Sequence, residues 1–246
     1  MPIKLGYWNI RGLGAPIRYQ LKFMDVPFEM VEYKCGDGPD FDDSQWLDVK
    51  FKLELELPNL PYIIDHDSDF SLSESLAIHK YLAKKYKPDL LGKSQKHKTR
   101  VEMLSNAVND LNWAVRRPMY EQDQVAPILE IISAKLPPLI KVLGPKAFLA
   151  GDAPTFVDFL FWEVVQLMAS VHPELLSEYP TLKTYTETVA ALPGLKEYLV
   201  DPACVDQRYA FNNKRAKIAN QETTPVVGDD KGESQQEETV LAVVEA

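Results

Sequence analysis

The sequence predicts an α/β domain over residues 1–86, ordered βαβ, a long excursion and then ββα, followed by an all-helical domain over residues 93–215. In the first 86 residues, short runs typical of strands are interleaved with segments of helical periodicity. From about residue 93 to residue 200, apolar residues instead recur almost everywhere at helical spacing. The 246 residues are enough to form packed cores of this kind.

Each element of the first domain has its own signal. Residues 3–8 are an apolar run that ends before two chain-breaking glycines, and residues 28–34 alternate apolar and polar side chains like a half-buried strand. A turn-rich segment, CGDGPDFDD, follows them. The other predicted elements are helices at 15–25 and 74–86 and short strands at 61–65 and 69–72. Pro88 and Gly92 mark residues 87–92 as a linker.

The clearest helix start in the second domain is Thr155, three residues before Asp158, because this pair can bond the free amides of a first turn. Pro137 and Pro138 lie inside a helical stretch and are predicted to bend or break it. Residues 216–246 are polar and acidic and are predicted to be a disordered tail. A partner-binding motif in the final TVLAVVEA is the alternative for that tail.

Charge and composition exclude several classes of function. The formal charge is -9, but residues 221–246 account for -6 of it, so the body is nearly balanced. Such a body does not favour binding to nucleic acid or to an anionic membrane surface. Two cysteines and four scattered histidines show no metal-ligand spacing, and no run could span a bilayer or direct secretion. We therefore expect a cytoplasmic protein without a metal site.

Three local patterns are candidates for chemistry. Tyr7 and Trp8 end the first strand, where they either pack or point the Tyr7 hydroxyl into a cleft. Leu60-Pro61 precedes a strand, and a cis bond there would turn the Leu60 backbone N–H and C=O outward, toward a peptide-like ligand.

The third pattern is Ser73-Glu74-Ser75, which opens the helix predicted at 74–86. It reads as a helix cap, and it would also suit a ligand with both a carboxylate and an ammonium group. The carboxylate would meet the free amides of the helix, and the ammonium group would meet Glu74.

Four segments, in this order, resemble the cytosolic glutathione transferases, and the pattern is most similar to the mu class. They are LGYWNIRGLGAPIR, PDFDDSQWLDVKFKLELELPNLPYIID, SESLAIHKYLAKKY and LAGDAPTFVDFLFWE. The resemblance covers roughly residues 2–200. It implies a thioredoxin-like first domain, an all-helical second domain, and a homodimer whose active sites lie near the subunit interface.

The resemblance also implies roles for individual residues. Tyr7 matches the catalytic tyrosine, whose hydroxyl hydrogen-bonds the glutathione sulfur and so favours the thiolate, the form that attacks electrophiles. Positions matching the glutathione site are Trp8, Leu13, Trp46, Lys50, Asn59, Leu60, Glu74 and Ser75, with Asp110 reaching the glutathione of the other subunit. Positions matching the electrophile pocket are Ile10, Arg116, Tyr120 and Phe211.

The implied activity is conjugation of reduced glutathione, as a co-substrate, to hydrophobic electrophiles. Two alternatives remain open, namely a binding or structural protein with little activity and a glutathione-dependent isomerase. Asp43, Leu57 and Arg116 depart from the mu pattern, where an arginine, a large aromatic and often an aliphatic residue stand. They predict weaker glutathione binding unless Lys50 or a nearby base compensates, a looser dimer, and a more polar co-substrate.

Overall fold

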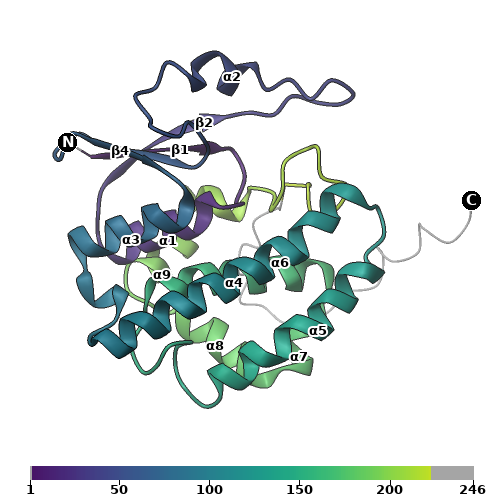
Figure 1. The fold of residues 1–246 in the computed structure, drawn as a ribbon. Helices are drawn as coiled ribbons and strands as arrows, with labels where there is room; N and C mark the ends of the chain where they lie inside the picture. Colours follow the sequence, from purple (N-terminus) through teal and green to yellow (C-terminus); the bar gives the residue numbers. More distant parts are fainter. Residues whose placement is uncertain (1, 223–246) are drawn as a thin grey trace, which may run out of the picture.

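The computed structural model describes residues 2–222. Met1 and residues 223–246 lie outside the described part of the chain, and with them lies most of the predicted tail. The described chain has a small sheet-containing domain, at the top of Figure 1, and a larger helical domain below it. None of the helices in residues 2–222 is long and apolar enough to cross a membrane.

The sheet has four strands in the order β2-β1-β3-β4, and only the β1–β2 pair is parallel. The strands are β1 (Ile3–Trp8), β2 (Phe28–Tyr33), β3 (Tyr62–Asp65) and β4 (Phe70–Ser73), each within a residue or two of its predicted span. Strand β1 lies in the middle of the sheet, so both of its edges are hydrogen-bonded and its carboxyl end, with Tyr7, is held in place.

Helices cover both faces of the sheet (Figure 1). They are α1 (Gly14–Phe23), α2 (Ser44–Lys50) and α3 (Ser75–Tyr86). On one face, apolar residues of α1 and α3 such as Ile17 and Ile78 are fully buried against Ile63 of the sheet. The short α2, within the long excursion where the sequence predicted no helix, lies over the other face with Trp46 buried.

The helical domain begins after the short 3-10 helix η1 (Pro88–Leu91), which occupies the predicted linker. Its helices are α4 (Gln95–Glu121), α5 (Ala126–Leu143), α6 (Phe156–Val171), α7 (Leu175–Glu178), α8 (Pro180–Ala190) and α9 (Leu195–Val200), followed by the 3-10 helix η2 (Val205–Gln207). The predicted start of α6 is confirmed, since the Asp158 carboxylate accepts hydrogen bonds from the Thr155 backbone N–H (2.8 Å) and hydroxyl (3.0 Å).

One helix differs from its prediction. Helix α5 continues from Ala126 to Leu143 through both Pro137 and Pro138, so of the predicted bend or break, the break is wrong. Each internal proline removes a helical hydrogen bond, at about 3 kcal/mol. Leu136 and Leu139 beside them are buried in the helical core, and burial of such a side chain contributes about 1.5–3 kcal/mol. Tertiary packing therefore keeps the helix continuous.

The last described residues return to the sheet-containing domain. They pack against the rest of the protein beyond residue 216, where the sequence predicted a disordered tail to begin. Ala216 is buried, and the N–H of Lys217 donates to the carbonyl of Met119 at the end of α4 (2.8 Å). The Tyr209 hydroxyl donates to Glu32, and Lys214 pairs with Asp37, both on the first domain. This C-terminal segment, residues 208–222, thus links the two domains beside the end of α4.

Candidate active site

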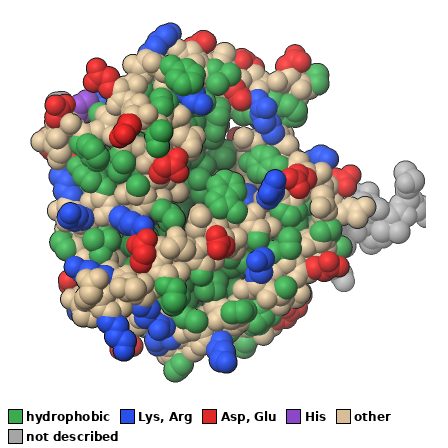
Figure 2. All heavy atoms as spheres, viewed as in Figure 1, with side chains coloured by type: hydrophobic (Ala, Val, Ile, Leu, Met, Phe, Trp, Pro, Cys, Tyr) green, Lys and Arg blue, Asp and Glu red, His purple; other side chains and the backbone are tan. Residues whose placement is uncertain are grey.

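A cavity of about 580 Å³ opens between the end of β1 and the end of α4. Its lining residues are Tyr7, Trp8, Ile10, Gly12, Leu13, Leu60, Trp113, Arg116, Arg117, Tyr120, Glu121 and Asn213. Figure 2 shows the surface hollowed between the two domains, with hydrophobic side chains in the hollow. Seven residues that the sequence placed in one site, from Tyr7 to Tyr120, are brought together here from both domains.

The Tyr7 side chain is 7% exposed and lies at the edge of this cavity. Its hydroxyl oxygen accepts a hydrogen bond from the backbone N–H of Leu13 at 2.9 Å, which leaves its own proton available for donation. Burial raises the pKa of Tyr7 above its ordinary value, although the Leu13 N–H and the charge of Arg116 lower it in part. The phenol is therefore protonated at neutral pH and can act as a hydrogen-bond donor.

Two glycines allow the loop after β1 to pass close to the Tyr7 side chain. A Cβ atom at Gly12 would stand 2.5 Å from the Tyr7 hydroxyl oxygen, and one at Gly14 would stand 2.5 Å from Cδ1 of the Tyr7 ring. Gly12 also has a positive φ of 43°. The sequence predicted these glycines only as chain breakers, since nothing in it indicated how closely the loop approaches the tyrosine.

The Leu60–Pro61 bond is cis, as hypothesised from the sequence. The Leu60 N–H, however, donates to the side-chain oxygen of its neighbour Asn59 (2.9 Å), so it already has a partner. The amide of Asn59 in turn donates to Glu74 at 3.2 Å. Asn59 therefore joins the Leu60 turn to the start of α3.

The start of α3 borders a second, smaller cavity that shares residues of the Tyr7 loop with the main one. Glu74 has a positive φ of 68°, an unusual value for a residue with a side chain, and Ser75 follows it as the first helical residue. Ser75 borders a smaller adjacent cavity together with Gly12 and Leu13. The strained turn places the free amides of α3 beside the Tyr7 loop.

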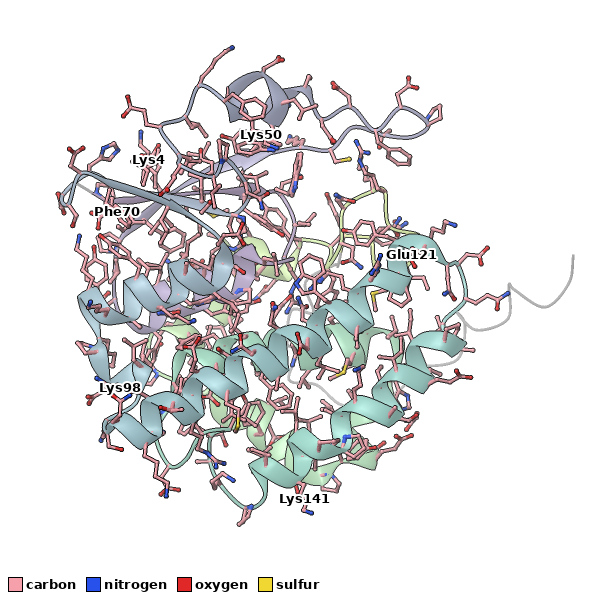
Figure 3. The ribbon with its side chains drawn as sticks, viewed as in Figure 1. Lys4, Lys50, Phe70, Lys98, Glu121 and Lys141 are labelled. Carbon is pink, nitrogen blue, oxygen red and sulfur yellow. The ribbon has the colours of Figure 1, made fainter. Side chains whose placement is uncertain are left out.

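Trp46 and Lys50 come from α2. Trp46 is 5% exposed and packs on the Tyr62 ring, within the same buried cluster as Tyr7 and Leu60. Lys50 ends the helix over the sheet, and Figure 3 labels it there. Neither residue lines the main cavity, but the cluster joins Trp46 to its wall.

The other predicted residues come from α4 and the C-terminal segment. Arg116 is 4% exposed, while Tyr120 is only partly buried and its hydroxyl is 3.4 Å from the N–H of Asn213. Phe211 does not line the cavity; its carbonyl accepts from Arg116 (2.7 Å), and its ring lies 4.1 Å from the Arg11 guanidinium. Asp110 is exposed on α4 and lies outside the cavity lining.

Asp43 does not present a bare negative charge. Its carboxylate pairs with the guanidinium of Arg215, which also donates to the carbonyl of Phe41 at 2.7 Å. Arg215 is therefore a base that compensates the charge of Asp43, and it lies 172 residues away along the chain. No local pattern indicates this pair, because the C-terminal segment approaches the first domain only in the folded chain.

Sequence reasoning also missed Trp113, whose ring is 49% exposed yet borders the cavity. It lies three residues before Arg116, so helical spacing on α4 places both near the same wall. Arg117 and Glu121 form an exposed ion pair of 3.0 Å at the rim, where Figure 3 labels Glu121.

Comparisons with known proteins identify both domains of the chain. The model of the glutathione S-transferase N-terminal domain matches residues 3–84, and that of the C-terminal domain matches residues 109–202. The chain is 38% identical to glutathione S-transferase Mu 3 of Homo sapiens and 37% identical to Mu 5 of Rattus norvegicus. Each alignment covers 88% of this chain and 95% of the relative.

Solved structures show the same fold. The glutathione S-transferase Blo t 8 superposes with a TM-score of 0.74 at 27% identity, covering 88% of this chain and all of that one. A Pi-class glutathione S-transferase from Onchocerca volvulus gives a TM-score of 0.73 at 25% identity, with the same shares covered. The two-domain architecture, the family models and the mu-class relatives together show that this chain belongs to the glutathione S-transferase family.

Proposed function

We propose that the protein conjugates reduced glutathione to small hydrophobic electrophiles, with the Tyr7 hydroxyl stabilising the glutathione thiolate. The observation that carries this proposal is the position of Tyr7: a protonated phenol at the edge of a mostly apolar cavity, with its oxygen held by the Leu13 N–H and its proton free. A hydrogen-bond donor at this place suits an anionic sulfur.

The magnitude of one hydrogen bond is sufficient for this role. A hydrogen bond to a charged group contributes about 1.5–3 kcal/mol, and one pKa unit corresponds to about 1.4 kcal/mol. A single phenol donor would therefore lower the pKa of a thiol near 8.5 by about one to two units, which makes the thiolate a major species at neutral pH. An electrophile held in the adjacent cavity then meets the sulfur without a bimolecular encounter.

Glutathione would lie along the surface from Tyr7 toward α2 and α3. We assign its cysteinyl part to Leu60, its γ-glutamyl end to Glu74 and Ser75, and its glycine carboxylate to Trp46 and Lys50. Asn59, which joins the Leu60 turn to Glu74, supports the first two positions. Trp8 and Leu13 line the wall beside Tyr7, and glutathione acts as co-substrate without a further cofactor.

We also propose that two copies assemble, as is typical of the family. Asp110 is exposed on α4 and lies outside the lining of the main cavity of its own subunit, which suits a residue that reaches the γ-glutamyl group bound by the partner. Leu57 is 65% exposed on the excursion before β3, where an apolar contact with a neighbour would cover it. Its aliphatic side chain offers less apolar area than a large aromatic one.

The two alternative functions make different demands on Tyr7. A binding or structural protein does not require its hydroxyl, whereas a glutathione-dependent isomerase requires the thiolate but releases glutathione unchanged. Thiol transfer by a cysteine is not favoured, because Cys35 and Cys204 are both buried and burial raises the pKa of each thiol.

The decisive variant is Tyr7→Phe. Loss of the hydroxyl should raise the pKa of bound glutathione by about one to two units and slow conjugation of a chloronitroaromatic substrate about 10- to 100-fold at neutral pH. The thiolate is followed by its ultraviolet absorbance during a pH titration, and conjugation by the product absorbance. Tyr120→Phe removes the other cavity hydroxyl and should leave the thiolate pKa close to that of the unmodified protein. Equal pKa values in the unmodified protein and Tyr7→Phe would refute the role of Tyr7.

A further inference from the structure

The cavity wall contains a buried positive charge without a negative partner. The guanidinium of Arg116 donates from Nη1 to the Phe211 carbonyl (2.7 Å) and to the Asn212 side-chain oxygen (2.5 Å), and from Nε to Asn112 (3.3 Å). All three acceptors are neutral, and Nη2 is buried without an acceptor. Among residues 2–222, no carboxylate lies within ion-pairing distance of this guanidinium.

Two further arginines, the largely buried Arg11 and the fully buried Arg18, are arranged differently. Arg11 pairs with Glu163 and Arg18 pairs with Asp206, and both pairs lie at the contact between the domains. Removing a charge from water is expensive, and neutral hydrogen bonds recover only part of that free energy. Three neutral acceptors explain how Arg116 is held in one orientation, but they leave its charge unbalanced.

The charge acts on the space where the reaction would take place. Arg116 lines the same cavity as Tyr7 and Tyr120. Burial raises the pKa of both tyrosines, and the charge of Arg116 counteracts that rise in each. An anion in the cavity would therefore be attracted by a charge that water and counter-ions screen weakly.

We propose that the electrophile pocket selects co-substrates that carry a carboxylate, and that Arg116 is the residue that recognises this group. This inference deepens the proposed conjugation and rests on it for the identity of the reacting sulfur. The bound acid supplies the counter-charge that the protein omits, while the apolar walls formed by Trp8, Ile10 and Trp113 receive the rest of the molecule. Arg116 is thus a specificity-determining residue.

A chloronitrobenzoate is a suitable probe, with the matching chloronitrobenzamide as its neutral counterpart. In either reaction the glutathione thiolate attacks the carbon that bears chlorine, the sulfur–carbon bond forms, and chloride leaves with the electron pair of the broken bond. The thiol proton passes to water when the thiolate forms. No oxidant or other co-reactant is consumed, and the two probes are similar in size and shape but differ in charge at a position remote from the reacting carbon.

The test compares kcat/KM for the two probes, each divided by its uncatalysed rate with free glutathione. The unmodified protein should prefer the acid by about tenfold or more, because a hydrogen bond to a charged group is stronger than one between neutral groups. Arg116→Gln and Arg116→Met should reduce this ratio to near one, whereas Arg116→Lys should retain part of the preference because it keeps the charge.

The matched control is Arg117→Gln. It removes the neighbouring positive charge, which is exposed at the rim and already paired with Glu121. The normalised ratio should change by less than about twofold, because an exposed and paired charge is well screened. An equal loss in the Arg117 and Arg116 variants would show a general effect of net charge and would overturn the assignment to Arg116.

A binding measurement separates this inference from the proposed function. Calorimetry with a nitrobenzoate and a nitrobenzamide that lack chlorine reports affinity without any reaction. Tighter binding of the acid, lost in Arg116→Gln, supports the inference even if neither chlorinated probe is conjugated, in which case the conjugation proposal fails alone. Equal affinity of the unmodified protein for the two compounds overturns the inference even if conjugation is fast.

Discussion

Two regions of the contact between the two domains each bury an arginine side chain, but only one of them supplies a carboxylate to pair with it. On one side, the Arg18 guanidinium on α1 is fully buried against Asp206, with Nε 2.9 Å from one carboxylate oxygen, and the Tyr198 hydroxyl donates to the same carboxylate at 2.7 Å. At the cavity, Arg116 is almost as deeply buried and meets only neutral oxygens. Each of the two guanidinium groups has one nitrogen without a hydrogen-bond partner, so the two regions differ in whether a carboxylate balances the charge.

This difference separates a structural contact from a binding surface. A charge that is paired inside the protein is satisfied in the folded state and has no electrostatic need of a ligand. A charge left unpaired beside a cavity lowers the stability of the empty protein and raises its affinity for an anion. The region around Arg18 therefore holds the domains together, and the region around Arg116 is prepared for a ligand.

The largest effect is expected from Asp206→Asn. This variant keeps the shape of the side chain but leaves Arg18 buried without its counter-charge, which should lower the free energy of unfolding by about 3–5 kcal/mol. Urea denaturation followed by circular dichroism measures the change. Arg116→Met is the matched comparison and should lower it by only about 1 kcal/mol, since three hydrogen bonds are lost but an unpaired charge is removed as well. Equal losses would end the distinction between the two regions.

His79 on α3 illustrates a third arrangement, in which the buried group stays neutral. It is fully buried, Nδ1 is hydrogen-bonded to Gln20, and Nε2 has no partner. Burial lowers the pKa of His79 from 6.5 to about 3. Between these values the unfolded chain binds a proton that the folded chain does not, so this contribution to stability is complete above pH 6.5 and is lost as the pH falls.

We therefore expect His79→Gln to flatten the acid side of the stability profile. Below pH 6.5, the free energy of unfolding of the unmodified protein should fall relative to that of the variant by at most about 1.4 kcal/mol per pH unit. Urea denaturation of both proteins at pH values between 5 and 7.5 measures the difference, in which the other titrating groups cancel. Parallel profiles would show that His79 does not remain neutral in the fold.

The smallest effect is expected at the exposed pair of Arg215 and Asp43, whose side chains are 44% and 22% exposed. Arg215→Gln should weaken glutathione binding by up to about fivefold, because exposed ion pairs contribute about 0.2–1 kcal/mol and the Asp43 carboxylate would then repel the glycine carboxylate. Calorimetric titration with glutathione at low and high salt measures the change, which salt should reduce.

The double variant Asp43→Asn/Arg215→Gln is the control, and it should regain the affinity lost in Arg215→Gln. Asp43→Arg alone, which the sequence pattern would recommend as a way to tighten binding, should give no such gain, because a guanidinium at position 43 would face Arg215. Unchanged affinity in Arg215→Gln would place Asp43 outside the influence of the glutathione carboxylate.

Much of the fold could be predicted from local signals. Periodicity located the four strands and the helices α1 and α3 of the first domain but not the short α2. The Thr155–Asp158 pair located the start of α6, because these features depend on neighbours within a few residues. The continuity of α5 through Pro137 and Pro138 could not be predicted in this way, since it depends on burial of leucines against other helices.

For the site, the sequence by itself determined the residue types and their order along the chain, including Tyr7 at a strand end, Leu60 before a proline and Arg116 on a helix. Only the tertiary structure decided that Phe211 holds Arg116 through its carbonyl rather than lining the cavity, that Arg215 neutralises Asp43, and that Arg116 has no counter-charge. Whether a charge is balanced depends on groups that are close in space but distant along the chain, so only the folded arrangement can decide it.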